Sequence, residues 1–113
     1  MAVARGEVWT ADLSPTVGTE QSGVRPVLVV QTDRANPVSP HTILVPFTSR
    51  IRQRLLPSHV AVPAREGGLT QDSVALCEQI RVADLNRLIR KLGDLPAPRM
   101  QEVDDALRAI LEL

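Results

Sequence analysis

Short runs of apolar residues alternate with turn-forming residues along most of the chain, and each run has the length of a β-strand. The run Val27–Val30 is apolar throughout, which is typical of a strand buried on both faces. Pro46 lies inside another run and predicts an edge or a bulge there, because proline cannot donate a ladder hydrogen bond. The predicted strands cover residues 7–13, 24–32, 42–47, 59–62, 73–82 and 88–92.

Near the C-terminus the hydrophobic period changes from that of a strand to that of a helix. The apolar residues that recur on one helical face are Met100, Val103, Leu107, Ile110 and Leu111. Pro96 and Pro98 stand where such a helix would begin, a position at which proline is tolerated. We therefore expect a mainly β protein, a small barrel of five to six strands, closed by one C-terminal amphipathic α-helix of about four turns.

Composition limits the size of the protein and excludes some classes. With 113 residues, 43% of them hydrophobic, the chain fits one globular domain over residues 1–113. No apolar stretch approaches the roughly 20 residues that cross a bilayer, and residues 1–6 lack the apolar segment of a secretion signal. We expect a cytoplasmic protein with no membrane segment. The lone Cys77 excludes an internal disulfide and a cysteine-based zinc site, so we expect no metal and no cofactor.

The net charge is zero, but the charges are unevenly distributed. Residues 34–65 contain five arginines and no acidic residue, whereas residues 94–113 contain five acidic residues and two arginines. Twelve of the thirteen cationic side chains are arginine, which binds phosphate through two hydrogen bonds and stacks on bases. The pattern fits a phosphate-bearing partner, and it fits an ordinary solvated surface equally well.

Two loops have a composition that suggests function. Residues 14–23 (SPTVGTEQSG) are small, polar and turn-forming, and they connect two predicted strands. Residues 49–57 (SRIRQRLLP) combine three arginines with two leucines. Loops of this length between barrel strands often bind ligands, and a merely flexible connection is the alternative.

A series of short motifs follows in order over nearly the whole chain. They are Arg5–Trp9 (RGEVW), Asp12–Pro15 (DLSP), Gly18–Val29 (GTEQSGVRPVLV), Pro46–Ser49 (PFTS), Leu56–Val60 (LPSHV), Asp72-Ser73 and Glu78–Arg81 (EQIR). In this combination the sequence resembles the MazF/PemK-type toxins of bacterial toxin–antitoxin pairs.

The resemblance implies a compact SH3-like barrel that forms a homodimer. It implies a sequence-specific, metal-independent endoribonuclease that cuts single-stranded RNA, usually mRNA, to a 2′,3′-cyclic phosphate and a 5′-hydroxyl. It also implies a MazE-like antitoxin whose disordered tail lies across the RNA groove and blocks it.

Cleavage by the neighbouring 2′-hydroxyl needs no protein nucleophile, only cations and hydrogen-bond donors around the phosphate. The resemblance implies that Arg25 and Thr48 are catalytic, with Ser49 assisting. Because guanidinium has a pKa above about 12, we expect Arg25 first to clamp the phosphate, and to donate a proton only if the site perturbs it strongly. Without the motif, Arg25 would be expected to pair with Glu20 or Glu78, and Thr48 to form a plain turn.

Carboxylates and amides bind the Watson–Crick edges of splayed bases. The expected base readers are Glu20, Gln21, Glu78 and Gln79. Because Glu78 and Gln79 are adjacent in a predicted strand, we expect only one of them to face the groove. A partly buried Glu78 bonded to Arg25 or Arg81 is the alternative.

Arginines would contact the RNA backbone, which gives affinity without sequence information. The candidates are Arg50, Arg52, Arg54 and Arg81. Trp9 and Phe47 are expected in the core, so aromatic stacking platforms are scarce. His41 and His59 suggest an acid–base pair, but His41 is at a turn and the resemblance puts His59 outside the catalytic motifs.

Two other functions stay open. A non-catalytic toxin of similar fold could act on a protein target such as DNA gyrase through its C-terminal helix, although the apolar stripe of this helix suits packing on its own sheet. An SH3-like binding module is the other reading, but it would have no reason to keep Arg25-Pro26 together with Thr48. Cleavage of long single-stranded RNA in the presence of EDTA would support the ribonuclease, and intact RNA would support the other two functions.

Overall fold

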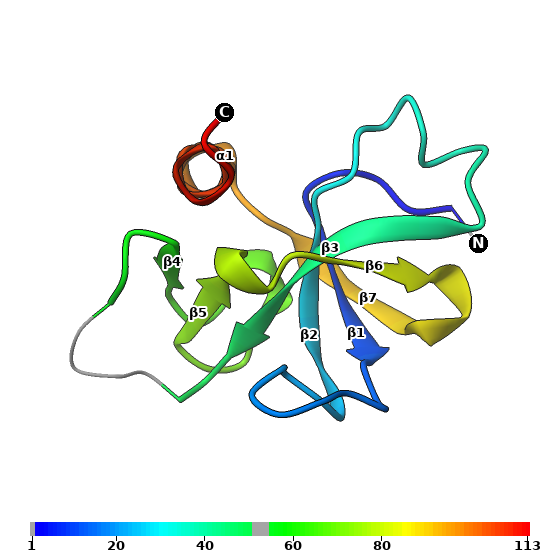
Figure 1. Ribbon diagram of the computed structural model, residues 1–113, viewed down its shortest axis with the longest axis horizontal. Helices are drawn as coiled ribbons and strands as arrows, with labels where there is room; N and C mark the ends of the chain where they lie inside the picture. The colour runs from blue at the N-terminus through cyan, green and yellow to red at the C-terminus, as the bar shows by residue number, and fades with distance from the viewer. Residues whose placement is uncertain (1, 51–54) are drawn as a thin grey trace.

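The computed structural model describes residues 2–50 and 55–113, which form one seven-stranded sheet with a helix beside it (Figure 1). The strands are β1 (Glu7–Asp12), β2 (Val24–Val29), β3 (His41–Thr48), β4 (His59–Val62), β5 (Ser73–Leu76), β6 (Arg81–Asp84) and β7 (Leu88–Asp94). The helix is α1 (Ala97–Leu111), and three short 3₁₀ turns are η1 (Glu66–Gly68), η2 (Cys77–Gln79) and η3 (Leu85–Arg87). Within the described ranges, none of the helices has the length and apolar character that crossing a membrane requires.

β3 is the central strand of the sheet. The order of pairing is β4-β5-β3-β2-β1-β7, and β6 pairs with β3 outside this path. The first half of β3 lies against β6, and its last two residues lie against β5. Every pair is antiparallel, and in the described residues no pairing joins β4 to β7, so the sheet stays open. The predicted mainly β fold with a C-terminal helix is confirmed, but the expected closure of the sheet into a barrel is not found among the described residues.

The structure divides the strand that the sequence predicts over residues 73–82. β5 ends at Leu76, η2 turns the chain, and β6 begins at Arg81. This division raises the number of strands from the expected five or six to seven. Its physical reason is that β5 and β6 pair with opposite ends of β3, so the chain must change direction between them. Leu76 and Cys77, where the strand ends and the turn begins, are both apolar and buried, so the hydrophobic pattern did not indicate the break.

Both faces of β2 and β3 are buried, which explains the unbroken apolar run Val27–Val30. On one face Leu28 and Phe47 pack in a cluster that includes residues of α1. On the other face Val27 packs with Trp9. The prediction that Trp9 and Phe47 belong to the core is therefore confirmed.

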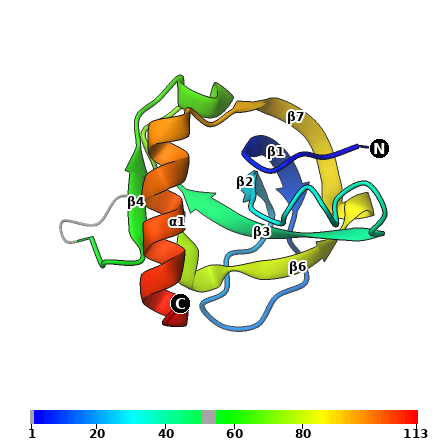
Figure 2. The same cartoon turned by 90° about the horizontal axis from the view of Figure 1, so that it is seen from above.

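α1 covers one end of the sheet and runs along β4 (Figure 2). It begins after Pro96, as predicted, and buries Val103 and Ala106. The turn η2 also packs against α1 and carries Cys77, which is fully buried. Burial raises the pKa of the Cys77 thiol to about 12, and neighbouring Glu78 adds to the rise. The helix thus fixes the position of η2, the turn that faces the candidate site.

Candidate active site

The start of β2 and the end of β3 bring Arg25 and Thr48 together. The two strands are antiparallel with Val27 opposite Pro46, and the same register continued by two residues puts Arg25 opposite Thr48. Nη1 of Arg25 donates to the carbonyl oxygen of Phe47 at 3.2 Å, which holds the guanidinium beside the end of β3. Both residues line the same two neighbouring depressions, of about 290 and 320 Å³.

Backbone carbonyls, rather than a carboxylate, hold the Arg25 guanidinium. In addition to the bond from Nη1, its Nε donates to the carbonyl oxygen of Ser22 at 2.9 Å. Among the described residues no carboxylate forms an ion pair with Arg25, so the expected alternative pairing with Glu20 or Glu78 does not occur there. Partial burial lowers the pKa of Arg25 below its usual value, and the positive charge of Arg50 lowers it further. The site therefore holds a charge that its surroundings do not neutralise.

Thr48 keeps its hydroxyl hydrogen available. Its Oγ1 accepts a hydrogen bond from the backbone N–H of Arg50 at 3.2 Å. Since a hydroxyl has one hydrogen to donate and two lone pairs, this contact leaves the hydrogen for another acceptor. Ser49 and Arg50 line a shared depression with Arg25 and Thr48. Four of the predicted site residues thus lie at one place.

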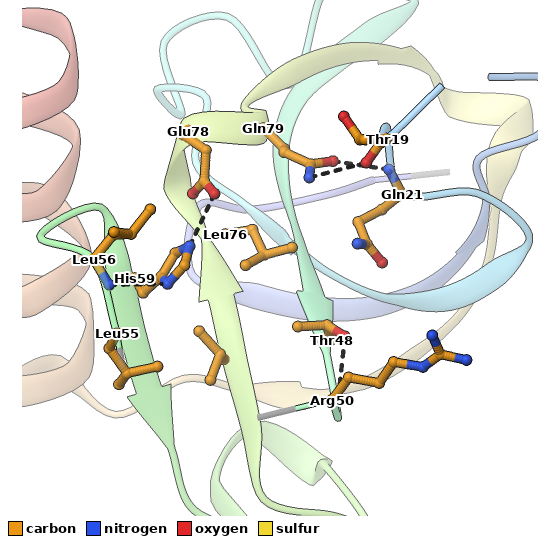
Figure 3. A pocket seen from close by; sticks show the side chains of 11 residues that line it. Thr19, Gln21, Thr48, Arg50, Leu55, Leu56, His59, Leu76, Glu78 and Gln79 are labelled. Atoms are coloured by element: carbon orange, nitrogen blue, oxygen red, sulfur yellow. Dashed lines mark hydrogen bonds and ion pairs between the residues drawn. The ribbon is translucent and has the colours of Figure 1, made fainter. Parts of the chain in front are cut away.

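The loop between β1 and β2 is tied to η2 by Gln79. The backbone N–H of Gln21 donates to Oε1 of Gln79 at 2.8 Å, and Nε2 of Gln79 donates to the carbonyl oxygen of Thr19 at 3.4 Å (Figure 3). Glu20 accepts a hydrogen bond from the backbone N–H of Val17 within the same loop. The amide that the sequence suggested as a base reader therefore fixes the loop in this structure.

The expectation that Glu78 and Gln79 point to opposite faces of a strand is wrong, because both lie in the 3₁₀ turn η2. Both side chains line a pocket of about 420 Å³ next to Thr48 (Figure 3). The Glu78 carboxylate accepts hydrogen bonds from Oγ of Ser58 at 3.2 Å and contacts Nε2 of His59 at 2.9 Å. It makes these contacts in place of either arginine considered from the sequence.

The remaining arginines are placed differently. Arg50 lines the pocket beside Glu78 and a depression beside Arg25. Arg81 lines a further depression with Glu20 and also donates from Nη1 to the carbonyl oxygen of Leu13 at 3.3 Å. Arg52 and Arg54, predicted to contact phosphates, lie outside the described residues.

Several residues of the pocket were not among the predicted site residues. They are Thr19, Leu55, Leu56, His59, Val74 and Leu76. Leu56 and His59 belong to the motif Leu56–Val60. The place of this motif in the site depends on the register of β4 on β5, which puts His59 opposite Leu76. No spacing rule in a single sequence supplies that register.

In the described residues the antiparallel sheet places the Arg25 guanidinium, with which no carboxylate pairs, beside the Thr48 hydroxyl and next to a pocket that contains the Glu78 carboxylate. Guanidinium and hydroxyl groups are donors that suit an anion, so the chain has the features of a small β protein with a candidate anion site. Residues 4–111 match the family model described as PemK-like, MazF-like toxin of type II toxin–antitoxin system. The chain therefore belongs to this family of toxins.

Individual relatives agree with the family. Over 113 residues the chain is 49% identical to Endoribonuclease EndoA of Bacillus subtilis (strain 168), covering all of this chain and 97% of that protein. A crystal structure of MazF from Deinococcus radiodurans is similar with a TM-score of 0.85 and 29% identity over 100% of this chain and 99% of the other. A MazE-MazF structure from the same organism matches with a TM-score of 0.79 and 29% identity over 100% and 98%.

Proposed function

We propose that this toxin is an endoribonuclease, a single domain over residues 1–113 that acts in the cytoplasm on single-stranded RNA, chiefly mRNA, and cuts it at particular sequences. The observation that carries the proposal is the charged Arg25 guanidinium, held without an ion-paired carboxylate in the described part of the chain, beside the free hydroxyl hydrogen of Thr48. The similarity to Endoribonuclease EndoA supports the substrate class.

The reaction needs the 2′-oxygen aligned with the phosphorus, the negative charge on the phosphate stabilised and two protons transferred. The 2′-oxygen forms a bond to phosphorus while the bond from phosphorus to the 5′-oxygen breaks, giving a 2′,3′-cyclic phosphate and a 5′-hydroxyl. The proton of the 2′-hydroxyl passes to solvent water, and a proton from solvent is delivered to the 5′-oxygen, so the reaction has no net gain or loss of protons. Arg25 clamps the phosphate and stabilises the negative charge that grows on its non-bridging oxygens, and Thr48 donates a hydrogen bond to one of them. Ser49 assists at the same depression. The chemistry requires no metal and no cofactor.

Binding of the RNA extends from this centre in both directions. Arg50, Arg52 and Arg81 contact backbone phosphates and supply affinity without sequence information. Bases are read in the pockets beside η2. The residues proposed to read them are Glu20, Gln21, Glu78 and Gln79, of which Gln79 also holds the loop that carries Gln21.

The toxin acts as a homodimer and is neutralised by a MazE-like antitoxin that covers the RNA groove. The antitoxin is supported by the family, whose members are toxins of toxin–antitoxin pairs, and by the similarity to a MazE-MazF structure. Sedimentation of the purified toxin at micromolar concentration tests the dimer, and a species of monomer mass alone would contradict it.

The function is tested with purified protein, a long single-stranded RNA and EDTA. Discrete fragments with 5′-hydroxyl ends are expected. Arg25→Ala should lower the cleavage rate by at least about 10³-fold while the circular-dichroism melting curve is unchanged, because the site loses its main charge stabiliser. Arg34→Ala, which removes an exposed arginine far from the site, is the matched control and should cut normally. RNA left intact by folded wild-type protein would contradict the proposal and favour a toxin that acts on a protein such as DNA gyrase.

A further inference from the structure

The hairpin of β4 and β5 brings a histidine against the carboxylate of η2. His59, the first residue of β4, lies opposite Leu76, the last residue of β5. Next to this pair, the N–H of Cys77 donates to the carbonyl oxygen of Ser58 at 3.0 Å, and the 3₁₀ turn then places Glu78 beside Ser58 and His59. The contact between His59 and Glu78 is therefore fixed by backbone geometry.

The hydrogen bonds around His59 assign its tautomer. The backbone N–H of Leu56 donates to Nδ1 of His59 at 3.1 Å, so Nδ1 carries a lone pair. The proton of the neutral ring is then on Nε2, which donates to Oε2 of Glu78 at 2.9 Å. If both ring nitrogens carried a proton, the N–H at Nδ1 would face the backbone N–H of Leu56, and two donors would meet without an acceptor. His59 thus works as a bridge that accepts from the loop and donates to the carboxylate.

The Glu78 carboxylate is held at both of its oxygens. Oε2 accepts from His59, and Oε1 accepts from the hydroxyl of Ser58. A carboxylate has about four lone-pair sites, so each oxygen keeps one for a ligand. The exposure of the side chains fits this division of roles, since His59 is only 10% exposed whereas Glu78 is 30% exposed. Both side chains line the pocket, and the Glu78 carboxylate points toward the His59 imidazole (Figure 3).

The pocket in front of Glu78 combines this acceptor with apolar walls. Leu55, Leu56, Val74 and Leu76 line it. Apolar side chains can cover the face of a nucleobase where aromatic rings are lacking, and this chain has one Trp, one Phe and no Tyr. The exposed lone pairs of a fixed carboxylate attract an amino group on the edge of such a base and repel a carbonyl oxygen.

We infer that His59 is a positioning residue for substrate recognition: it orients Glu78 so that the carboxylate receives the exocyclic amino group of one RNA base held in this pocket. The inference rests on the proposed ribonuclease function and deepens it. It assigns no step of bond cleavage to His59. Sequence reasoning put this histidine outside the catalytic motifs; the inference agrees with that and gives the residue a different role.

The test deletes amino groups one at a time. Cut sites are first mapped on a long RNA, and short RNAs spanning one site are then made with single replacements of adenosine by purine riboside, guanosine by inosine, or cytidine by the 2-pyrimidinone riboside. Each replacement removes only an exocyclic amino group. For wild-type protein we expect one position at which the loss lowers kcat/KM by about 10- to 100-fold, the range for a hydrogen bond to a charged group.

Two variants separate the two hydrogen bonds of His59. His59→Gln keeps an N–H donor near the place of Nε2, and His59→Asn keeps an acceptor near the place of Nδ1. At the sensitive position His59→Asn should reduce the discrimination to about threefold or less, whereas His59→Gln should retain about tenfold. His41→Gln and His41→Asn, on an exposed histidine at the far end of β3, are the matched controls and should leave it unchanged.

Three outcomes would overturn the inference. The first is a wild type with no position sensitive to loss of an amino group. The second is His59→Asn discriminating as wild type does. The third is His59 variants that slow cleavage of amino-bearing and amino-free RNAs by the same factor, which would indicate a general structural or catalytic role. Thermal melts of each variant verify that the fold is retained.

A binding experiment separates this inference from the proposed function. Fluorescence anisotropy is measured with labelled 2′-O-methyl oligomers, which cannot be cut. The amino-bearing oligomers contain adenine, cytosine or guanine, and their counterparts contain purine, 2-pyrimidinone or hypoxanthine. If wild-type protein cuts no RNA but binds one amino-bearing oligomer at least about tenfold more tightly than its counterpart in a His59-dependent way, the ribonuclease proposal fails alone. Equal binding of every oligomer and its counterpart would overturn the inference.

Discussion

Thr48→Val removes one hydroxyl from the site and changes little else. Valine has the same branched shape, and β-branched residues are favoured in strands, so the end of β3 should keep its conformation. The structural contact that is lost is the hydrogen bond from the N–H of Arg50 to Oγ1 at 3.2 Å. Because this bond is exposed, its loss should lower the free energy of unfolding by at most about 1 kcal/mol.

The effect on cleavage should be much larger than the effect on stability. If the Thr48 hydroxyl donates to the phosphate only as negative charge develops, its removal costs about 10²- to 10³-fold in kcat, or roughly 3–4 kcal/mol of transition-state stabilisation. KM should change by less than about threefold, since the contact adds little to ground-state binding. Thr48→Ser keeps the hydroxyl and should stay within about tenfold of wild-type kcat.

The assay is multiple-turnover cleavage of a short RNA that spans a mapped site, with the RNA in excess over the protein and its concentration varied to separate kcat from KM. Urea unfolding of the same preparations measures stability. Cleavage by Thr48→Val within about threefold of wild type would refute the assigned role, and so would a Thr48→Ser variant as slow as Thr48→Val.

Two further predictions concern the fold. Gly68→Ala should lower the free energy of unfolding by about 2–5 kcal/mol, because φ is +75° and a Cβ there would overlap the carbonyl of Leu92. Gly18→Ala, at φ +60° in open space, should lower it by only about 1 kcal/mol. Equal losses of the two variants in urea unfolding would contradict the steric reason. Burial opposes ionisation of Glu7, but hydrogen bonds from Ala4, Lys91 and Trp9 outweigh it and lower the pKa below its usual 4.5. The ionised Glu7 side chain therefore stabilises the fold at a pH above its usual pKa, and this stabilisation is lost as the pH falls through the pKa of the folded state. The difference in free energy of unfolding between wild type and Glu7→Gln should shrink between pH 6 and pH 3. A difference that does not depend on pH would contradict this prediction.

Most of the fold could be predicted because burial and chain direction leave clear marks in the sequence. The run Val27–Val30 belongs to a strand buried on both faces, and Pro96 and Pro98 mark the start of the helix, with Pro98 in its first turn, where proline is tolerated. The turn at η2 could not be predicted, because Leu76 and Cys77 are apolar and buried whether the chain continues straight or bends. Only the pairing of β5 and β6 with different ends of β3 forces the bend, and that pairing is tertiary.

The site shows the same limit. The motifs pointed to Arg25 and Thr48, and the register of β2 on β3, continued by two residues, places these two residues opposite each other. Nη1 of Arg25 also donates to the carbonyl oxygen of Phe47, the residue before Thr48. The contact between Gln21 and Gln79 joins residues 58 positions apart, and that between His59 and Glu78 joins residues 19 apart. Whether a side chain is free to face the candidate site or instead holds another segment in place therefore depends on register, which amino-acid type alone does not encode. That is why Gln79 could be named from the sequence but its role in holding the loop could not.

A chain of zero net charge can bind a polyanion only if some of its positive charge is kept from neutralisation by its own acids. In the described residues Arg99, Arg108 and Arg5 are paired with carboxylates, whereas Arg25 is held by two carbonyl oxygens. A carbonyl fixes the direction of a guanidinium without cancelling its charge, and partial burial then makes that charge more costly until an anion arrives. The lowered pKa of Arg25 is the expression of this cost. Under the proposed function, binding of a phosphodiester would relieve this cost, so a preference for an anion would follow from local geometry and would need no excess of basic residues.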